Sequence, residues 1–410
     1  MSTENHANYD VIIVGAGLVG ASFALSLAIH SAENALKVAL VEASPAGGAP
    51  DLTHFDPRVV ALTPHSQQLF ETLNVWADMK RQRVSPYMDM QVWDAEGTGR
   101  IDFNCGQVQQ PCLGHIVENS VVLSSVLDAV EKETSITVLR PAKVEQVLLP
   151  HEDSQGEGVT VLLESGEPLR GKLLVAADGA HSRVRELVNL PTREWAYGQK
   201  AIVTTVYTEK PHQQTAYQRF LETGPLAFLP LSCEDHRASA SSIVWSADES
   251  LADQLMALSD DDFCLSLAQS FEHRLGAVTQ VEKRYCIPLH QRHATKYFKA
   301  GVALIGDAAH TLHPLAGQGV NLGLLDCEVL SEEIVRASKR SIALGDEQIL
   351  RRFQRRRRGN NLAMMGLMEG FKRLFGSDDV TLRWLRNEGM GTLNNVPLVK
   401  NSLIREAMGL

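Results

Sequence analysis

Three glycines close to the amino terminus, Gly15, Gly17 and Gly20, stand in a G-x-G-x-x-G pattern that can bind phosphate. An apolar, β-branched run over 10–14 precedes them and predicts a buried strand, and residues 21–30 predict a helix. In such a turn the first glycine permits the tight bend, the second lets the backbone approach a pyrophosphate, and the third lets helix and strand pack closely. The free N–H groups and the dipole of the helix N-terminus would attract the phosphates. The predicted dinucleotide site comprises Gly15, Ala16, Gly17, Val19 and Gly20.

An acidic residue completes this unit. A second predicted strand over 37–41 ends at Glu42, 22 residues after Gly20, where a carboxylate can accept hydrogen bonds from an adenosine ribose. The negative charge disfavours the extra phosphate of NADP, so we expect FAD or NAD. A glycine-rich turn without a ligand is the competing interpretation, and the complete strand–helix–strand unit argues against it.

Two later acidic motifs follow predicted strands of the same kind. The strand over 173–177 leads to Asp178, and the strand over 301–305 leads to Asp307. A dehydrogenase would continue through further strand–helix units, whereas this chain leaves the pattern after Glu42 and returns to it only near its end. We therefore expect segments distant in the sequence to converge on one nucleotide. Taken singly, each acidic residue is more simply a helix cap or a surface charge.

The composition is typical of a globular protein. The 410 residues are 44% hydrophobic and 21% charged, which excludes a disordered or collagen-like chain, and the net charge of −10 argues against nucleic acid as a partner. The six cysteines form no C-x-x-C pair, so neither a zinc knuckle nor a disulfide framework is expected and the cytoplasm is the simplest location. His310 and His313 have no third ligand nearby, so no metal is expected. The uncharged run over 11–29 could suggest a membrane span, but its glycines and the absence of Lys or Arg before it favour the nucleotide unit.

Three motifs carry a resemblance to a known family: the glycine fingerprint, the D-G motif over 178–185 and the G-D motif at 306–307. On these motifs the chain resembles class A flavoprotein monooxygenases of the para-hydroxybenzoate hydroxylase superfamily. Within that superfamily it is similar to the ubiquinone-biosynthesis hydroxylases of the UbiH, UbiF and UbiI types, through the phrases at 114–119, 227–231 and 306–323. The resemblance covers nearly the whole chain.

The resemblance implies an α/β fold in which a Rossmann-like FAD-binding domain carries an inserted β-sheet substrate domain and a C-terminal helical region. The hydrophobic patterns predict one helix over 64–83, another over 119–132, and hairpin strands over 138–147 and 159–163. The expected domains are a first FAD-binding part over 1–190 with substrate-side strands near 86–118, a substrate domain over 191–290, a second FAD-binding part over 291–345, and the helical region over 346–410.

The resemblance also implies FAD-binding roles for the later motifs. Asp307 would accept a hydrogen bond from a ribityl hydroxyl, and the dipole of a predicted helix over 320–337 would favour negative charge on the reduced flavin. Asn119 stands where relatives often carry Arg or Gln. Asp178 and Arg185 belong to a motif that is linked both to FAD and to the reductant NAD(P)H. The implied cofactor residues are Arg58, Asn119, Val144, Asp178, Gly179, Asp307, Pro314, Gly317, Gln318, Gly319 and Asn321.

The implied chemistry is hydroxylation of an electron-rich aromatic ring. In such enzymes reduced FAD reacts with dioxygen to give a C4a-hydroperoxide that transfers one oxygen, and the protein holds the ring and excludes water. NAD(P)H would visit only transiently, because the chain has no second G-x-G-x-x-G. His313, beside Pro314, is the candidate acid or base, and a histidine hydrogen-bonded within the turn is the alternative.

Aromatic residues of the substrate domain are candidates for contacts with an apolar substrate. Trp195 belongs to this group, which could line a pocket for a prenylated ring. For any single member, a place in the core of the sheet is the better interpretation. The residues singled out are Tyr197, Phe220, Phe228 and Trp245.

The C-terminal third combines a basic run with an apolar helical face. Residues 351–358 contain six arginines, and Met364, Leu367, Met368, Phe371, Leu374 and Phe375 follow at helical spacing. Such a segment suits an anionic membrane or a partner subunit, which would place the protein in the cytoplasm with a peripheral contact on the inner face of the membrane. Packing on the FAD-binding domain with a solvated arginine face is the favoured alternative.

The leading hypothesis is therefore an FAD-dependent hydroxylase of a polyprenylated phenol or quinol in ubiquinone biosynthesis, working with dioxygen and with other quinone-biosynthesis proteins as candidate partners. The phrase at 114–119 resembles the UbiI type, which the family associates with C5 of the ring, while the tail resembles the UbiF type. Two alternatives stay open. One is a hydroxylase of a small soluble aromatic, and the other is a silent flavoprotein scaffold.

Overall fold

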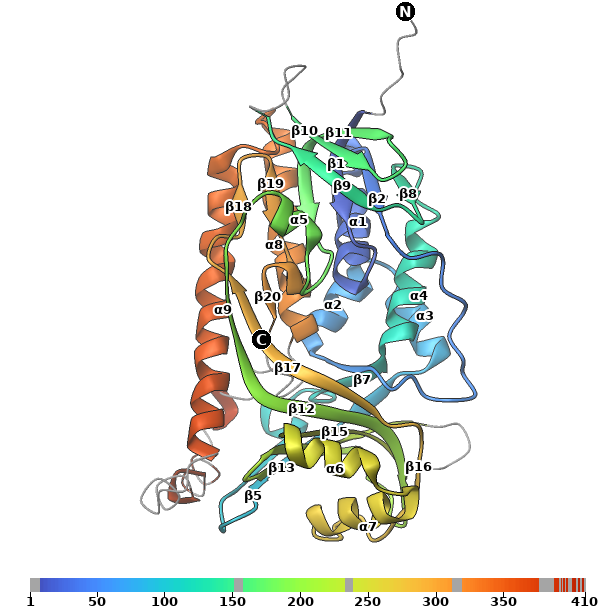
Figure 1. Ribbon diagram of the computed structural model, residues 1–410, viewed down its shortest axis with the longest axis vertical. Coiled ribbons are helices and arrows are strands. Elements are labelled where there is room, and N and C mark those ends of the chain that lie inside the picture. The colour runs from blue at the N-terminus through green and yellow to red at the C-terminus, as the bar shows by residue number, and fades with distance from the viewer. Residues whose placement is uncertain are drawn as a thin grey trace, which may run out of the picture.

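The computed structural model describes residues 8–150, 158–232, 239–311 and 319–375, together with 387–390, 392, 394, 396, 400–402, 405 and 408. Two bodies, each built on a large β-sheet, are stacked along the long axis of the molecule, and one long helix runs beside both (Figure 1).

The first body contains a mainly parallel sheet because its central strands are apolar runs buried on both faces. The strand order is β18-β19-β11-β1-β2-β8, and an antiparallel pair, β9 and β10, extends from β11. Helix α1 contacts both α4 and α8 where they cover the sheet. The strands are β1 (Asn8–Val14), β2 (Val38–Val41), β8 (Ile136–Leu139), β9 (Val144–Leu148), β10 (Val159–Leu163), β11 (Pro168–Ala176), β18 (Phe298–Lys299) and β19 (Val302–Leu304). The helices are α1 (Leu18–His30), α4 (Asn119–Val130) and α8 (Gly319–Lys339).

The second body is a nine-stranded sheet of order β20-β17-β12-β15-β14-β13-β5-β6, with β16 also paired to β12. All pairs are antiparallel except β13 with β5. Helices α6 (Glu249–Ala257) and α7 (Asp260–Ser270) cover one face through an apolar cluster. The strands are β5 (Asp89–Asp94), β6 (Arg100–Asn104), β12 (Thr192–Thr208), β13 (Thr215–Leu221), β14 (Gly224–Pro230), β15 (Ala240–Asp248), β16 (Val278–Val281), β17 (Tyr285–Ala294) and β20 (His310–Thr311).

A small sheet of order β3-β7-β4 joins the two bodies. Its apolar residues pack against the face of the second sheet that α6 and α7 leave uncovered. The long helix α9 (Glu347–Phe375) contacts α8 and β18. The remaining elements are β3 (Val59–Leu62), β4 (Ser85–Tyr87), β7 (Gly114–Glu118), α2 (Pro64–Thr72), α3 (Trp76–Gln82), α5 (Arg183–Leu187), and the 3-10 turns η1 (Ala32–Asn34), η2 (Cys105–Val108) and η3 (Gly306–Ala308).

Two predicted elements are wrong in their extent. The single helix expected over 64–83 is two helices, α2 and α3, because Asn74 adopts a left-handed conformation with φ of 58° that ends the first. The strand expected over 138–147 is also two, β8 and β9, and they pair with different neighbours, β2 and β10. Pro141 lies between them and has no N–H to donate to a sheet.

The structure places the expected domain limits relative to these elements. The limit at 190/191 falls just before β12, whereas the limit at 290/291 falls within β17. Strands β5 and β6 of the expected 86–118 region belong to the second sheet. Within the described part of the chain, no helix is both long and apolar enough to cross a membrane, and no group of His, Cys, Asp and Glu is arranged to hold a metal ion.

Candidate functional site

The glycine turn between β1 and α1 is shaped by close backbone contacts. Gly15 has a φ of 102°, and a Cβ atom there would lie 2.4 Å from the carbonyl oxygen of Ala177. A Cβ on Gly20 would lie 2.0 Å from the carbonyl oxygen of Gly15. Gly17 differs, because it is exposed and a Cβ there would meet nothing within 4 Å. The open space above Gly17, at the N-terminus of α1, is where a pyrophosphate would fit.

Glu42 stands directly after β2, at the same edge of the sheet as the glycine turn. Its Oε2 accepts a hydrogen bond from the Ala16 N–H at 2.8 Å, and its Oε1 accepts one from the Ser44 N–H at 2.8 Å. The carboxylate therefore joins the glycine turn to the end of β2, a structural role that the sequence pattern did not predict. Two further lone-pair positions remain for a ribose.

Asp178 and Arg185 follow β11 and link the D-G motif to the G-D motif. Asp178 Oδ2 accepts from the Val184 N–H at 3.1 Å, while Oδ1 is buried without a hydrogen-bond partner among the described residues. Burial raises the pKa of the Asp178 carboxyl, although nearby hydrogen bonds oppose the shift. Arg185 is buried and donates to the carbonyl oxygens of Ala308 and Ala180, each at 2.9 Å. Arg185 thus links the two motifs through hydrogen bonds. Gly179, directly after Asp178, has a φ of 83°.

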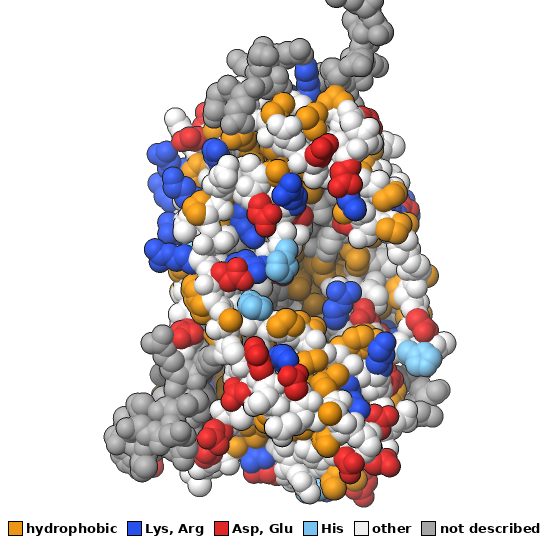
Figure 2. All heavy atoms as spheres, viewed as in Figure 1, with side chains coloured by type: hydrophobic (Ala, Val, Ile, Leu, Met, Phe, Trp, Pro, Cys, Tyr) orange, Lys and Arg blue, Asp and Glu red, His pale blue; other side chains and the backbone are white. Residues whose placement is uncertain are grey.

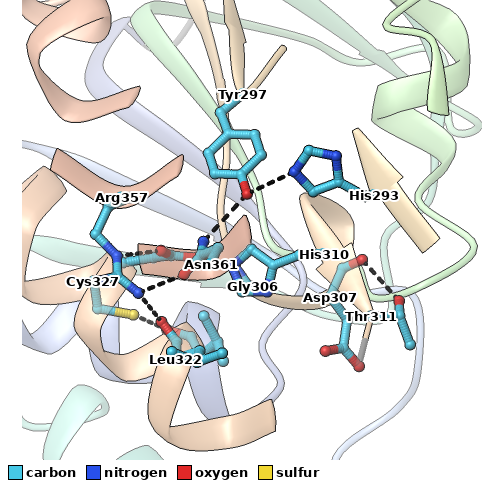
Figure 3. Close-up of polar contacts among 12 residues, drawn as sticks. His293, Tyr297, Gly306, Asp307, His310, Thr311, Leu322, Cys327, Arg357 and Asn361 are labelled. Atoms are coloured by element: carbon cyan, nitrogen blue, oxygen red, sulfur yellow. Dashed lines mark hydrogen bonds and ion pairs between the residues drawn. The ribbon is translucent and has the colours of Figure 1, made fainter. Parts of the chain in front are cut away.

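Asp307 lies in η3, directly after β19. Its carboxylate has no hydrogen-bond partner among the described residues, and its backbone oxygen accepts from Thr311 at 3.3 Å (Figure 3). Solvent reaches the side chain, yet protein surrounds most of it, and this desolvation raises the pKa of the Asp307 carboxyl while nearby His310 opposes the shift. An unused acceptor at this strand end suits a ribityl hydroxyl.

Asn321, in the first turn of α8, is buried and engaged within the protein. Its Nδ2 donates to the carbonyl oxygen of Ala61 at 2.8 Å, and its Oδ1 accepts from the hydroxyl of Ser66 at 2.7 Å and from the Thr63 N–H at 3.2 Å. These bonds tie α8, which begins at Gly319, to β3 and α2. The Asn321 amide therefore holds the first turn of α8 in place against these elements.

Arg58 and Asn119 are brought together, since the Asn119 N–H donates to the Arg58 carbonyl oxygen at 2.9 Å, and the Arg58 side chain is exposed. The loop before Arg58 is anchored by Glu118, whose Oε1 accepts from the Asp56 N–H at 2.7 Å and from Arg83 at 2.8 Å. Sequence reasoning missed this anchor, because its residues are far apart in the chain and follow no period.

Other predicted cofactor residues differ in how far the structure places them. Val144 begins β9 and is buried in the core of the first body. Val19 lies in the first turns of α1, next to the glycines. Four predicted residues fall outside the described part of the chain, namely His313, Pro314, Gly317 and Gln318.

The four substrate-domain aromatics lie on two opposite faces of the second sheet. Phe228 stacks on Phe271 of the α7 end with ring centroids 3.9 Å apart, and Trp245 lies 6.1 Å from Phe263 of α7. Both therefore belong to the core beneath the helices, as the alternative of a place in the core of the sheet predicted. The other two lie on the face that α6 and α7 leave uncovered, and these are Tyr197, which hydrogen-bonds to Gln291, and Phe220, which packs against Met390 and Met364.

Three of the six arginines in the basic run of α9 pair with acidic residues of α8. Arg357 is 2% exposed and lies 2.7 Å from Asp326, while Arg356 lies 2.7 Å from Glu332 and Arg352 lies 3.2 Å from Glu333. Arg357 is therefore a buried ion-pair residue, whereas Arg356 and Arg352 keep part of their side chains exposed, and the interpretation of the run as a surface for a membrane or a partner stays a prediction. Helix α9 packs on α8 and β18 of the first body, as the favoured alternative expected.

A buried polar network beside η3 joins α8, α9, β20 and η3, and part of it is drawn in Figure 3. Asp326 of α8 is fully buried and accepts from His310 Nε2 at 2.6 Å, from Arg357 Nε at 2.7 Å and from the Gly306 N–H at 3.0 Å. Sequence reasoning missed Asp326, and it considered His310 only as a possible metal ligand, which it rejected. Glu328 stands in the same apolar stretch of α8, so no signal in the sequence singled out Asp326.

The motifs therefore meet at one edge of the parallel sheet, because Gly15, Glu42, Asp178 and Gly306 each follow a strand of the parallel set. Such an edge is where nucleotides bind in α/β sheets. The surface is hollowed between the two bodies, with hydrophobic side chains inside the hollow and Lys, Arg and His side chains at its edge (Figure 2).

Comparisons with known proteins agree with this geometry. A family model described as "FAD binding domain" matches residues 8–361. The chain is 34% identical over 402 residues to the 3-demethoxyubiquinol 3-hydroxylase of Escherichia coli (strain K12), with 98% of each chain covered. It is 32% identical over 442 residues to the mitochondrial ubiquinone biosynthesis monooxygenase COQ6 of Danio rerio, with 98% of this chain and 90% of that one covered. Among solved structures, PqsL of Pseudomonas aeruginosa, a probable FAD-dependent monooxygenase, superposes with a TM-score of 0.77 at 22% identity and covers 94% of this chain and 100% of that one.

Proposed function

Because the chain belongs to the FAD-binding family that includes the ubiquinone-biosynthesis hydroxylases, and is an FAD-dependent aromatic-ring monooxygenase, we propose that its substrate is a polyprenylated phenol or quinol intermediate of ubiquinone biosynthesis. The support is full-length similarity to relatives whose names give ubiquinone or ubiquinol chemistry, at 32–34% identity.

The residues present fit FAD. The carrying observation is the group of unused positions along one sheet edge: open space at Gly17, a carboxylate without a partner at Asp307, and a buried orphan oxygen at Asp178, the last two judged among the described residues. A pyrophosphate at the α1 N-terminus and a ribityl hydroxyl at Asp307 would satisfy the first two. The Asp178 oxygen would accept a hydrogen bond from either FAD or the transiently bound NAD(P)H.

Bound FAD, reduced by NAD(P)H, supplies the activation of dioxygen. The chain itself binds and orients the two ring systems and keeps water away from them. The uncovered face of the second sheet carries the apolar residues Tyr197, Val203 and Leu289, which suit an aromatic ring with an apolar tail. Of the predicted substrate contacts, we retain Tyr197 and Phe220, and we retain His313 as the acid or base.

Two ring positions are in question. The phrase at 114–119 favours C5, whereas the name of the E. coli relative favours a demethoxyubiquinol hydroxylated at position 3. The test is mass spectrometry of quinone-pathway lipids in cells that lack the gene. An accumulated prenylated intermediate that lacks one ring hydroxyl would identify both substrate and position.

The same experiment separates the alternatives. A normal quinone pool without accumulated precursors would contradict the proposed substrate and favour a small soluble aromatic. A silent scaffold would be indicated if flavin-site variants restored the quinone pool of these cells as well as the wild-type protein does. We propose peripheral contact with the membrane as the route of the substrate, to be checked by sedimentation with anionic vesicles.

A further inference from the structure

Asp326 is the centre of a buried ion-pair network with no direct place in the chemistry described so far. The carboxylate receives three hydrogen bonds from three different elements: Arg357 of α9, His310 of β20 and the backbone of Gly306 in η3. The side chains of Asp326 and His310 have no exposed surface, and that of Arg357 is 2% exposed.

We propose that Asp326 is a positioning residue for FAD, which acts with Arg357 and His310 to hold η3 and the first turns of α8 in the geometry that FAD binding requires. The inference concerns the cofactor and does not depend on which aromatic compound is hydroxylated.

The electrostatics define the protonation of the network. Burial raises the pKa of the Asp326 carboxyl, but His310 and Arg357 lower it by more, so the pKa lies below its usual value. An ionised carboxylate can only accept, so His310 Nε2 must carry a proton and donate it. Asp326 thereby fixes the orientation of the His310 ring, whose Nδ1 is buried without a partner among the described residues. Thr311 and the predicted flavin segment follow His310 directly.

The network continues away from the flavin edge into the core (Figure 3). The Arg357 guanidinium also donates to Asn361 Oδ1 at 2.9 Å, and Asn361 Nδ2 donates to the Tyr297 hydroxyl at 3.2 Å. Tyr297 in turn contacts His293 Nε2 at 3.1 Å. The guanidinium is therefore held on both sides, so Arg357 cannot move without breaking several buried hydrogen bonds.

The position of α8 matters for the pyrophosphate end of the site as well. A Cβ on Gly323 would lie 2.7 Å from Val19 Cγ2, in the first turns of α1, and 3.3 Å from Gly306 Cα. Cys327, the neighbour of Asp326, donates through Sγ to the Val19 carbonyl oxygen at 3.1 Å. Helix α8, η3 and the start of α1 are thus in mutual contact, and a shift of α8 would disturb both ends of the FAD site.

Stability alone is a weak reason to retain this network. A buried ion pair is often no more stabilising than well-packed apolar side chains, because desolvation of the charges offsets their attraction. The carboxylate also bonds the Gly306 N–H, immediately before the Asp307 acceptor, which an apolar replacement could not do. A role in positioning accounts for that third bond.

The same two helices offer a matched control in Glu333. This carboxylate is 1% exposed and lies 3.2 Å from Arg352 and 3.1 Å from Arg356, also between α8 and α9. It stands seven residues after Asp326, about 10 Å farther along α8 at 1.5 Å per residue. Asp326→Asn and Glu333→Gln therefore both remove a buried charge from this helix pair, but only the first touches η3.

The test uses full-length protein stripped of FAD and compares three readouts for both variants: the melting temperature of the apoprotein, the FAD Kd from fluorescence titration, and the absorbance spectrum of the bound flavin. We expect both variants to melt earlier. Asp326→Asn should raise the FAD Kd by about tenfold or more, the size of one lost charge-assisted hydrogen bond, and shift the flavin bands. Glu333→Gln should keep the Kd within about twofold of wild type.

A second pair decides the question if Asp326→Asn does not fold. His310→Gln keeps an N–H donor for Asp326 and should bind FAD nearly as wild type does, whereas His310→Leu removes the donor and should bind more weakly. Equal FAD affinities within this pair, or equal losses in the Asp326 and Glu333 variants, would overturn the inference and leave the proposed substrate untouched. If the wild-type protein bound FAD normally but cells lacking the gene accumulated no lipid intermediate, the proposed substrate would be overturned and this inference would stand.

Discussion

The glycine turn allows folding and cofactor binding to be separated by two single substitutions, Gly17→Ala and Gly20→Ala. Gly17 has φ −68° and ψ 179°, a conformation open to any residue, and its Cβ would meet nothing within 4 Å. Alanine at a compatible position stabilises by about 0.4–1 kcal/mol through the unfolded state. The apoprotein of Gly17→Ala should therefore be at least as stable as wild type.

The same methyl group would stand in the space that we assign to the pyrophosphate. Gly17→Ala should accordingly raise the FAD Kd by about tenfold or more, equivalent to about 1.4 kcal/mol. Gly20→Ala has the opposite profile, because its Cβ would lie 2.0 Å from the Gly15 carbonyl oxygen and 3.0 Å from Ala177 Cβ. The backbone must move, so we expect the apoprotein to lose about 3 kcal/mol or more.

The assay is urea unfolding of each apoprotein, followed by FAD titration at a urea concentration where each is folded. The reasoning would be refuted if Gly17→Ala bound FAD as tightly as wild type, since the open space would then not hold the cofactor. It would equally be refuted if Gly20→Ala unfolded at the wild-type urea concentration, because the close contact would then be without cost.

Three further predictions follow from other residues. Asp307→Ala should raise the FAD Kd and leave the melting temperature of the apoprotein unchanged, as measured by titration and scanning fluorimetry, because the carboxylate has no partner among the described residues. The hydrogen bond from His65 to Glu328 raises the pKa of His65, so its stabilisation is complete below the unfolded pKa of about 6.5 and is lost as pH rises through the folded value. The stability gap between wild type and His65→Gln should thus be larger at pH 6 than at pH 9, and a gap that grows with pH would contradict this pairing. Phe228→Ala should cost about 3–5 kcal/mol in urea unfolding without changing the substrate KM, whereas Tyr197→Phe should alter KM at little cost in stability.

The shared sheet edge that we assign to the cofactor was predictable from sequence because its signals are local. Buried parallel strands are short β-branched runs, and each delivers a glycine or a carboxylate at the strand end, so Gly15, Glu42, Asp178 and Asp307 stand out without knowledge of the fold. The geometry then adds roles that local patterns do not encode, such as the bond from Glu42 back to Ala16.

Features that depend on the pairing of distant elements could not be predicted in this way. Asp326 and Arg357 are 31 residues apart on two helices, and nothing in either helix shows which polar residue faces inward to the other. The alternation of a strand shows that Tyr217 and Phe220 lie on opposite faces, but not which face a helix pair will cover. Phe228 and Trp245 were therefore as plausible in the site as Tyr197 until α6 and α7 were placed.

The parallel sheet of the first body also has a consequence for synthesis on the ribosome. Strand β11 is made well before β19, which pairs with Leu174–Ala176 of β11 and comes only at Val302–Leu304. At a synthesis rate of about 5–20 residues per second, this edge of β11 stays unpaired for about 6 to 25 seconds until β19 is made. During that interval an apolar strand edge is open to pairing with other chains. A nascent chain of this protein should therefore depend on chaperones until the G-D motif emerges, and we expect FAD to bind only after that point.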